Sequence, residues 1–372
     1  MRGNNVLGII FANADERSLP ELTGIRSIAS VPFGGSYRLI DFVLSDMVNA
    51  GITKVGVITN NNYQSLMDHL GSGKPWELAR KDKGLYLLPP FNADAVDNYS
   101  ASRIGALKNI RHFLERSSEE YVLVSDSTVV ANIDFADVFK FHEEKKFDIT
   151  LLYRHGKAPS RDVQPVFDEI ADSRIRKMSL ADYSGGEVDF GLKTLIMKKA
   201  LFERLIDESS AKGFNSFEKD LLLANIDTLK IGAYEVEGYC EVIDSLASYF
   251  DANFKLLCPE NYKQLFNPAR PVFSKVYDDM PAVYGLDSDV KNSLVADGCI
   301  IEGEVENSIL FRDCRIGKGA VVKNCIVLPH GLISDNAMMN YCVTDKSVTV
   351  GAGKSLSGAE TYPVYIGKGI KI

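Results

Sequence analysis

Acidic side chains stand in the loop after the first apolar segment, where chemistry on a nucleotide would need the opposite charge. Residues 6–11 (VLGIIF) form a short, continuous run that predicts a buried strand. A loop that cradles phosphates after such a strand is normally rich in glycine and carries a basic residue. The loop here begins Asn13-Ala14-Asp15-Glu16, with no glycine and two carboxylates. Its composition therefore argues against an ordinary triphosphate loop.

A second polar loop follows a second predicted strand. Residues 121–124 (YVLV) precede Ser125-Asp126-Ser127, which places one carboxylate between two hydroxyls. In open α/β sheets, ligands bind beyond the carboxyl ends of the strands. The loops after Phe11 and Val124 are therefore where a ligand site is expected.

The elements that would position these loops alternate between short strands and amphipathic helices over residues 1–257. This alternation predicts a mostly parallel α/β sheet of Rossmann-like type. The expected strands are 6–11, 54–58, 121–124, 148–153 and 191–197. The expected helices are 37–50, 62–70, 105–115, 135–145 and 201–208.

The pattern changes after a proline-containing connector, 258–290. Beyond it short β-rich pieces recur, and three of them share an aliphatic-Gly-x-Gly unit that begins at Ile316, Val350 and Ile366. Aliphatic residues spaced five to six apart, with Gly, Asn and Asp between them, predict a parallel β-helix of hexapeptide coils over 291–372. A small antiparallel β domain is the alternative.

Composition narrows the classes of function. The 372 residues, 45% hydrophobic and 25% charged, fit a globular protein of two domains. A net charge of −8 argues against a nucleic-acid surface, and neither a membrane span nor a signal peptide is indicated. The six cysteines include no CxxC pair. We expect them to be small buried side chains in a reducing cytoplasm, with a zinc site or a disulfide framework as the alternative.

Four stretches together resemble a known family. They are VPFGGSYRLIDFVLSDMVNAGI (31–52), HLGSGKPWEL (69–78), YEVEGYCEVIDSLASYFDANFKLL (234–257) and the β-helix tail. In this order, over nearly the whole chain, they resemble bacterial glucose-1-phosphate adenylyltransferase, or ADP-glucose pyrophosphorylase. The resemblance implies a sugar-nucleotide transferase domain, a left-handed β-helix and tetrameric assembly. It also implies a family reaction in glycogen synthesis, in which ATP and glucose 1-phosphate give ADP-glucose and pyrophosphate with Mg²⁺.

Against this family, the residues that would handle triphosphate and metal are replaced. Catalytic chains carry a GGRGxRL-type loop, and the matching loop here has Asp15 and Ser18 in place of its arginines. A carboxylate about 5 Å from a phosphate costs on the order of 3 kcal/mol at an effective dielectric near 20. The basic residue of the family's KP pair corresponds to Ile28. The two metal-binding aspartates, from SGD and WRDVGT-type stretches, correspond to Ser127 and Val242, which removes the carboxylate ligands that Mg²⁺ uses.

The residues that match the family's sugar-phosphate contacts are replaced as well. The family's GTADA-type stretch corresponds to 101–105 (ASRIG), and its Glu-Lys pair falls near 180–181 (LA). The serine before the family's MG step corresponds to Asp189. Tyr99 matches a substrate-contacting tyrosine, so the resemblance implies a vestigial substrate pocket.

Two arginines match the family's site for phosphorylated effectors, which lies between the two domains. They are Arg26 and Arg38, although the lysine beside the first is replaced by Ile25. One interpretation is a remodelled effector site. The other is that both arginines form ion pairs, for example with Asp41 or Asp46.

The replacements together resemble the GlgD-type subunit, the non-catalytic partner of a catalytic chain. They imply a cytoplasmic regulatory subunit that raises the activity of its partner in a heterotetramer. Such a chain needs no cofactor of its own, since Mg²⁺ belongs to the catalytic partner, and binding to nucleic acid or membrane is not expected. One alternative is an active sugar nucleotidyltransferase whose metal site has moved to Asp126 and Asp244. Another is a homo-oligomeric sugar-nucleotide sensor.

Other residues have simpler interpretations. His330, in LPHGLI, lies where hexapeptide-repeat acyltransferases use a histidine as general base, but a corner or surface histidine accounts for it equally. Trp76 and the pair Tyr249-Phe250 are expected to pack in the core.

Overall fold

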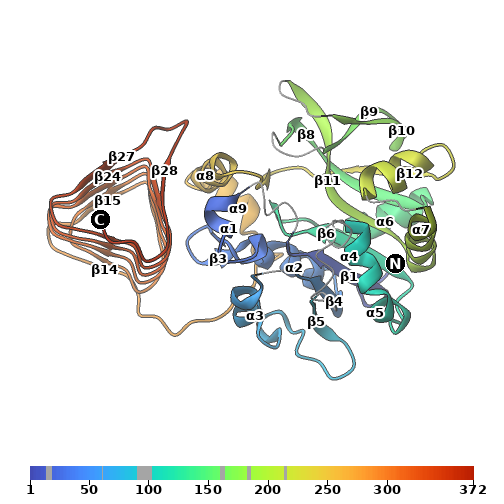
Figure 1. Ribbon diagram of the computed structural model, residues 1–372, viewed down its shortest axis with the longest axis horizontal. Helices are drawn as coiled ribbons and strands as arrows, with labels where there is room; N and C mark the ends of the chain where they lie inside the picture. The colour runs from blue at the N-terminus through green and yellow to red at the C-terminus, as the bar shows by residue number, and fades with distance from the viewer. Residues whose placement is uncertain (14–18, 61, 90–102, 160–163, 182–185, 213–215) are drawn as a thin grey trace.

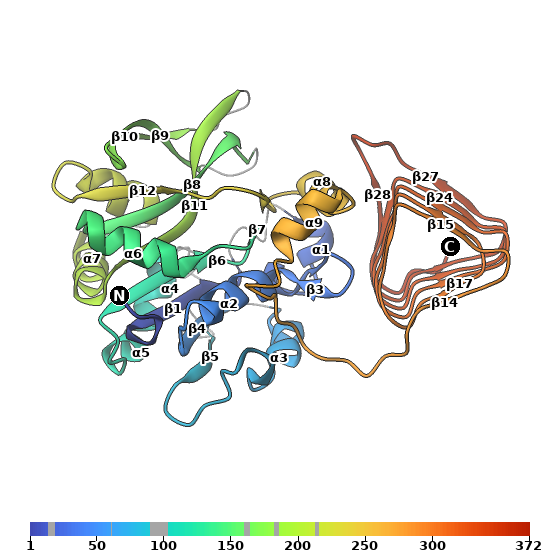
Figure 2. The same ribbon diagram turned by 180° about the vertical axis from the view of Figure 1, so that it is seen from behind.

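The chain forms two parts that lie side by side, an α/β domain with the N-terminus and a β-helix with the C-terminus (Figure 1). The computed structural model describes residues 1–13, 19–60, 62–89, 103–159, 164–181, 186–212 and 216–372. The β-helix is seen end-on as three walls around an interior, and the connector runs from the α/β domain to its first coil (Figure 2). The expected order of an α/β domain and a β-helix is confirmed.

A nine-stranded mixed sheet forms the centre of the α/β domain, in the order β5-β4-β1-β6-β11-β8-β12-β10-β9. The strands from β5 to β6 are parallel, whereas β11 runs antiparallel to both β6 and β8. The strand bounds are β1 Val6–Phe11, β4 Lys54–Ile58, β5 Gly84–Leu88, β6 Tyr121–Asp126, β8 Ile149–Lys157, β9 Gln164–Ala171, β10 Arg174–Ala181, β11 Glu187–Lys198 and β12 Ile231–Glu235. Two small antiparallel pairs of strands lie outside it: β2 Pro32–Phe33 with β3 Tyr37–Arg38, and β7 Val129–Ala131 with β13 Cys240–Val242.

The expectation of a mostly parallel sheet is wrong in the second half of the domain. The described residues place no helix between β8 and β11, and β9 and β10 pair antiparallel across a short turn. A parallel crossover needs a dozen or more residues, so strands joined by short connections pair antiparallel. The prediction failed because β9 and β10 were not recognised as strands between 153 and 191.

Helices cover both faces of the sheet. Leu44 of α2, Phe139 of α6 and the fully buried Trp76 belong to the core on one face, which confirms the packing role expected for Trp76. Leu107 of α4 and Phe202 of α7 belong to the core on the other face. The helix bounds are α1 Pro20–Thr23, α2 Leu39–Asn49, α3 Gln64–Leu70, α4 Arg103–Asn109, α5 Arg111–Glu115, α6 Phe135–Lys145, α7 Lys199–Lys212, α8 Leu246–Lys255 and α9 Pro259–Leu265.

Local signals explain which helix bounds could be predicted. The bounds of α6 are confirmed, because the Asp134 side chain accepts the backbone N–H of Asp137 at its start and Lys146, at φ 54°, ends it. The single helix expected over 105–115 is instead α4 and α5, which are separated at Ile110. A π-helical segment, Phe217–Leu222, was not predicted.

Three parallel sheets of five strands form the walls of the β-helix. One interior column consists of Ile301, Ile316, Ile333 and Val350, which stack in register and are buried. This column confirms the repeat read from the sequence. The strand bounds are β14 Val283–Tyr284, β15 Asp289–Lys291, β16 Leu294–Val295, β17 Ile300–Ile301, β18 Glu304–Glu306, β19 Ile309–Leu310, β20 Arg315–Ile316, β21 Val321–Lys323, β22 Ile326–Val327, β23 Leu332–Ile333, β24 Met338–Asn340, β25 Cys342–Thr344, β26 Thr349–Val350, β27 Ser355–Ser357 and β28 Val364–Ile366.

The connector is more structured than the sequence pattern indicates. Helix α9 and strand β14 both lie inside the range 258–290 that was assigned to it, and β14 already pairs with β17 of the next coil. Its middle part is fastened to α2, since the Ser274 hydroxyl donates to Asp41 at 2.6 Å and Ser45 bonds with the backbone of Phe273.

The two domains share a hydrophobic core. Ile28, Tyr249 and Phe250 of the α/β domain belong to the same buried cluster as Phe311 and Val343 of the β-helix. The core role expected for Tyr249 and Phe250 is confirmed. This shared cluster fixes the boundary between the domains, where one of the candidate sites lies.

Candidate functional site

The carboxyl ends of β1 and β6 meet at one corner of the sheet, where the sequence predicted a ligand site. Phe11 and Asp126 are register partners, and the Ser127 N–H donates to the Phe11 carbonyl at 3.2 Å. Val242 on β13 pairs with Val129, which follows Ser127 by two residues. The fold therefore brings the two positions expected to have lost metal carboxylates, Ser127 and Val242, to the same corner.

The donor set that the described residues offer at this corner does not fit a magnesium ion. Ser127 supplies one buried hydroxyl, Val242 supplies no side-chain oxygen, and Ile28 lies fully buried in the apolar core. Mg²⁺ needs near-octahedral oxygen ligands, usually with carboxylates among them. Within the ranges that the structure describes, no group of three or more His, Cys, Asp or Glu residues could hold a metal ion. Ser18 and Tyr99, two further predicted positions, lie outside the described residues.

An arginine occupies the corner instead. Arg103, at the start of α4, forms an ion pair with the fully buried carboxylate of Asp126 and a second ion pair with Glu218 at 2.8 Å. Its guanidinium carbon lies 4.7 Å from the centre of the Phe11 ring, within the range of a cation–π contact. The guanidinium thus joins four elements: β1, α4, β6 and the π-helical segment.

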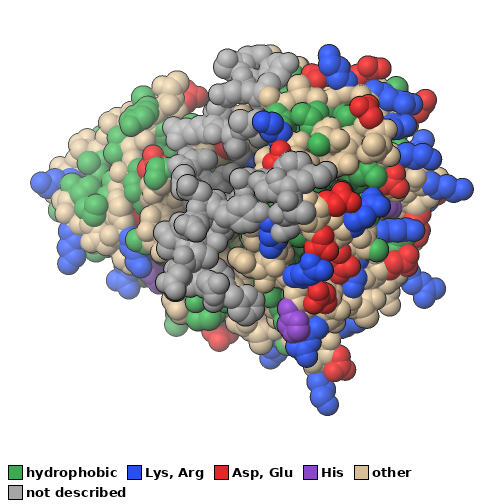
Figure 3. Space-filling model, turned by 45° about the vertical axis from the view of Figure 1, so that its right-hand side comes forward, with side chains coloured by type: hydrophobic (Ala, Val, Ile, Leu, Met, Phe, Trp, Pro, Cys, Tyr) green, Lys and Arg blue, Asp and Glu red, His purple; other side chains and the backbone are tan. Residues whose placement is uncertain are grey.

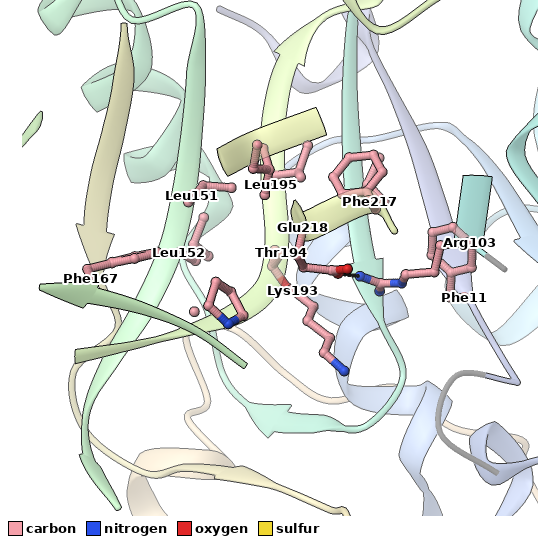
Figure 4. Close-up of a pocket in the computed structure, with 14 residues that line it drawn as sticks. Phe11, Arg103, Leu151, Leu152, Phe167, Lys193, Thr194, Leu195, Phe217 and Glu218 are labelled. Carbon is pink, nitrogen blue, oxygen red and sulfur yellow. Dashed lines mark hydrogen bonds and ion pairs between the residues drawn. The ribbon is translucent and has the colours of Figure 1, made fainter. Parts of the chain in front are cut away.

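Described residues beside this network enclose a small cavity. Figure 4 shows the Arg103 guanidinium facing Glu218, with Phe11 next to it and Phe167 on the far side of the cavity. The cavity that these side chains line has a volume of about 10 Å³. That is about the minimum that one water needs, and far less than a sugar phosphate occupies.

The carboxylates of the displaced-metal alternative have other partners. Asp126 pairs with Arg103, and Asp244 accepts the Ser245 hydroxyl at 3.0 Å. Asp244 and Ser245 stand at the start of α8, where both backbone N–H groups bond with the Ser248 hydroxyl. Asp244 is therefore part of a helix cap.

The sugar-phosphate positions do not converge on the corner. Asp189, on β11, bonds with the exposed His155 at 2.8 Å, and this bond raises the pKa of His155. Leu180 lies on β10, in the hairpin at the far edge of the sheet. Of the described residues in the stretch matched to the family's GTADA segment, 103–105, Arg103 reaches the corner through its ion pair with Asp126.

Arg26 forms an ion pair, but not with the residues expected. Its guanidinium donates two bonds, of 2.7 and 2.6 Å, to the carboxylate of Asp345 in the β-helix. Both side chains are at least 97% buried, and the Tyr365 hydroxyl also donates to Asp345 at 2.9 Å. The expected pairing with Asp41 or Asp46 is wrong, because the β-helix packs over Arg26 and brings a closer carboxylate.

Arg38 lines a pocket between the domains. It donates to the carbonyl and hydroxyl of Ser65 at 2.7 and 3.0 Å. The pocket has a volume of about 260 Å³ and is lined also by Arg312, His330 and Lys346 of the β-helix. Burial, followed by the charges of Arg38 and Arg26, lowers the pKa of Lys346 to about 7. A bound anion would relieve the repulsion among these cations.

The remaining predicted residues have structural surroundings. His330, at φ 62°, is an exposed corner residue 3.4 Å from Asp313, as the simpler interpretation held. Five of the six cysteines are buried free thiols, whereas Cys258 is exposed at the start of α9. The expectation of burial is therefore confirmed except at Cys258.

Two residues that matter at these sites were missed. Glu218 and Asp345 pair with the arginines, yet each lies far from its partner in the sequence, with separations of 115 and 319 residues. The sequence did contain a signal for Arg103. This arginine stands in a stretch where the family's GTADA pattern has no basic residue, and the expected metal carboxylates are replaced in the same chain.

Charged side chains of both signs lie on one face of the α/β domain (Figure 3). On the face shown in Figure 3, acidic and basic side chains are interspersed over the α/β domain. None of the helices in the described parts of the chain is long and apolar enough to cross a membrane.

Comparison with known proteins gives the same two-part organisation. Residues 8–161 match the nucleotidyl transferase family, and residues 280–360 match the family described as GlmU-like, C-terminal hexapeptide. The chain is thus of the nucleotidyltransferase class, with its α/β domain joined to a hexapeptide β-helix.

Full-length relatives narrow the class to one family. The chain is 36% identical to the glycogen biosynthesis protein GlgD of Bacillus subtilis (strain 168), over 100% of this chain and 98% of the relative. It is 37% identical to the GlgD protein of Geobacillus stearothermophilus, over 86% and 83% of the two chains. It is 33% identical to the glucose-1-phosphate adenylyltransferase of Clostridium botulinum (strain Alaska E43 / Type E3), over 88% and 85%. The chain belongs to the family formed by GlgD proteins and glucose-1-phosphate adenylyltransferases.

Proposed function

We propose that this chain is a non-catalytic, regulatory subunit of glucose-1-phosphate adenylyltransferase that acts in glycogen biosynthesis in the cytoplasm. It assembles with a catalytic chain into a heterotetramer and raises the activity of that chain. The partner binds Mg²⁺ and performs the transfer from ATP to glucose 1-phosphate. The mechanism is a shift of the partner's conformational equilibrium by contacts at their interface.

The observation that carries the proposal is the corner at the ends of β1 and β6. Ser127 and Val242 stand where the family pattern has carboxylates, and the remaining carboxylate, Asp126, is paired with Arg103. A transferase of this family needs charge stabilisation on a triphosphate, and the described residues of this corner offer no metal donor set for it. The similarity to two GlgD proteins, over 100% and 86% of this chain, supports the assignment to glycogen biosynthesis.

The test is ADP-glucose formation from ATP and glucose 1-phosphate. Three samples are compared: this chain alone, a catalytic relative alone, and the two co-expressed and purified as a complex. We expect no activity from this chain alone and more activity from the complex than from the catalytic chain alone. Mg²⁺-dependent activity of this chain alone, retained in Ser127→Ala and lost in Asp126→Asn, would instead establish the displaced-metal enzyme.

A control separates regulation from a shared active site. The complex is prepared again with a catalytic partner whose own metal-binding aspartate is replaced by asparagine. If this chain contributes no chemistry, that complex is inactive although it assembles. Activity restored in that complex would assign catalysis to this chain and refute the proposal.

We further propose that the pocket around Arg38 binds a phosphorylated effector, while Arg26 serves the contact between domains. Arg38, Arg312 and Lys346 line the pocket, whereas Arg26 is committed to Asp345. In the complex, Arg38→Ala should weaken the activation by a sugar bisphosphate without changing activity in its absence. Lys318→Ala, an exposed lysine of the β-helix, is the matched control. An unchanged effector response in Arg38→Ala would place any effector site elsewhere.

A further inference from the structure

We infer that the guanidinium of Arg103 takes the place of a divalent cation beside Asp126, so that an internal side chain neutralises this buried carboxylate at the end of β6. The inference goes beyond the proposed function, because a regulatory subunit could equally retain a bound metal. Its test measures metal binding and stability, whereas the proposed function is tested by activity. The inference and the proposed function can therefore fail separately.

The charge at the corner requires a cation. Asp126 is fully buried, and a buried carboxylate without a counter-charge is strongly destabilising. Arg103 supplies the charge directly, with its side chain 18% exposed and ion pairs to both Asp126 and Glu218. The ring of Phe11 adds an attractive surface for the same cation.

The geometry favours a guanidinium over a metal. The planar fork of an arginine presents donors in fixed directions, which suits two carboxylates that approach from different elements. Asp126 comes from β6 and Glu218 from the π-helical segment. A divalent ion at the same place would have to displace Arg103 from both carboxylates.

The same contacts also join neighbouring elements. Arg103 ties α4 and the π-helical segment to β6 and leaves a cavity of only about 10 Å³ beside it (Figure 4). These contacts hold the three elements together without any ligand. Arg103 is therefore a positioning residue for α4, β6 and the π-helical segment.

The experiment is thermal unfolding of the full chain with and without MnCl₂, at matched ionic strength. The wild-type Tm should not change with Mn²⁺. Arg103→Ala should lose several degrees in Tm and recover part of that loss when Mn²⁺ is added, since Asp126 and Glu218 can then share the added cation. Arg103→Lys keeps a positive charge and should lose less, without a Mn²⁺ response.

The matched control is Arg111→Ala on α5, because Arg111 also pairs with two carboxylates, Glu115 and Asp207, but is 56% exposed. Its Tm should stay within about 1 °C of wild type, because exposed ion pairs contribute little. Two results would overturn the inference. The first is a wild-type Tm that rises saturably with Mn²⁺, with no such rise in Asp126→Asn. The second is an Arg103→Ala variant with neither a lower Tm nor a Mn²⁺ response.

A measurement on the unaltered chain covers the case in which Arg103→Ala does not fold. Equilibrium dialysis of the wild-type chain against Mn²⁺ should reveal no stoichiometric site. One bound Mn²⁺ per chain, competed by Mg²⁺, would overturn the inference without any variant.

Discussion

The ion pair between Arg26 and Asp345 should hold the β-helix against the α/β domain. Arg26 donates two short hydrogen bonds to the carboxylate, and the side chains are 3% and 1% exposed. Replacing Arg26 by methionine keeps most of its volume and leaves the buried carboxylate without its cation. Removal of one partner of a buried pair typically costs about 3–5 kcal/mol.

The surroundings of Asp345 place the expected loss at the lower end of this range. After the substitution the carboxylate still accepts bonds from the Tyr365 hydroxyl at 2.9 Å and from the Lys346 backbone N–H at 2.7 Å. We therefore expect Arg26→Met to lower the free energy of unfolding by about 3 kcal/mol, roughly a hundredfold in the folding equilibrium. Arg26→Met combined with Asp345→Leu should regain most of it, because no buried charge is then left unpaired.

Urea unfolding measures this loss with two probes. The chain has one tryptophan, Trp76, which is fully buried in the α/β domain, so its fluorescence reports that domain, while far-UV circular dichroism reports both. The matched control is Arg204→Met, which breaks an exposed pair with Glu208 and should lose less than about 1 kcal/mol. If Arg26→Met loses no more than this control, or if the double variant is less stable than Arg26→Met alone, the reasoning is refuted.

Two further predictions concern stability. Burial lowers the pKa of His142 to about 4, whereas the same side chain has a pKa near 6.5 in the unfolded chain. Between these values the unfolded chain binds more protons, so the free energy of unfolding should fall as the pH drops from about 6.5 to 4. The fall should be smaller in His142→Gln. An unchanged slope in that variant would contradict this origin. In the β-helix, Gly303→Ala would place a Cβ 2.4 Å from the Ala320 carbonyl oxygen and should cost about 1–3 kcal/mol. Gly24→Ala, where the nearest atom is 3.4 Å away, is the control, and equal urea midpoints for the two variants would disprove the clash.

Much of the fold could be predicted because its signals are local. The apolar runs at β1 and β4 are confirmed to the residue, since a strand buried on both faces reads as a continuous apolar segment. The column from Ile301 to Val350 likewise repeats in the sequence as it does in space. The hairpin of β9 and β10 was missed because its strands carry many charged residues and lie partly exposed at the edge of the sheet.

The candidate site also has features that the sequence could predict and features that depend on distant segments. Ser127 and Val242 could be recognised from the sequence as residues that cannot replace a metal carboxylate, because ligand chemistry belongs to the residue type itself. That the two stand at one corner needed the pairing of β7 with β13. The pairing of Arg26 with Asp345 needed the docking of the β-helix, and its sequence separation is 319 residues.

The sequence alone thus determined the two-part architecture, the hexapeptide repeat and the prediction that Ser127 and Val242 replace the family's metal ligands. Only the tertiary structure decided that Arg103 fills the corner beside Asp126, and that Arg26 belongs to the contact between domains. The physical reason is that the strength of a charge interaction depends on its burial and on the nearest opposite charge. Both are set by segments that are distant in the chain and meet only when it folds.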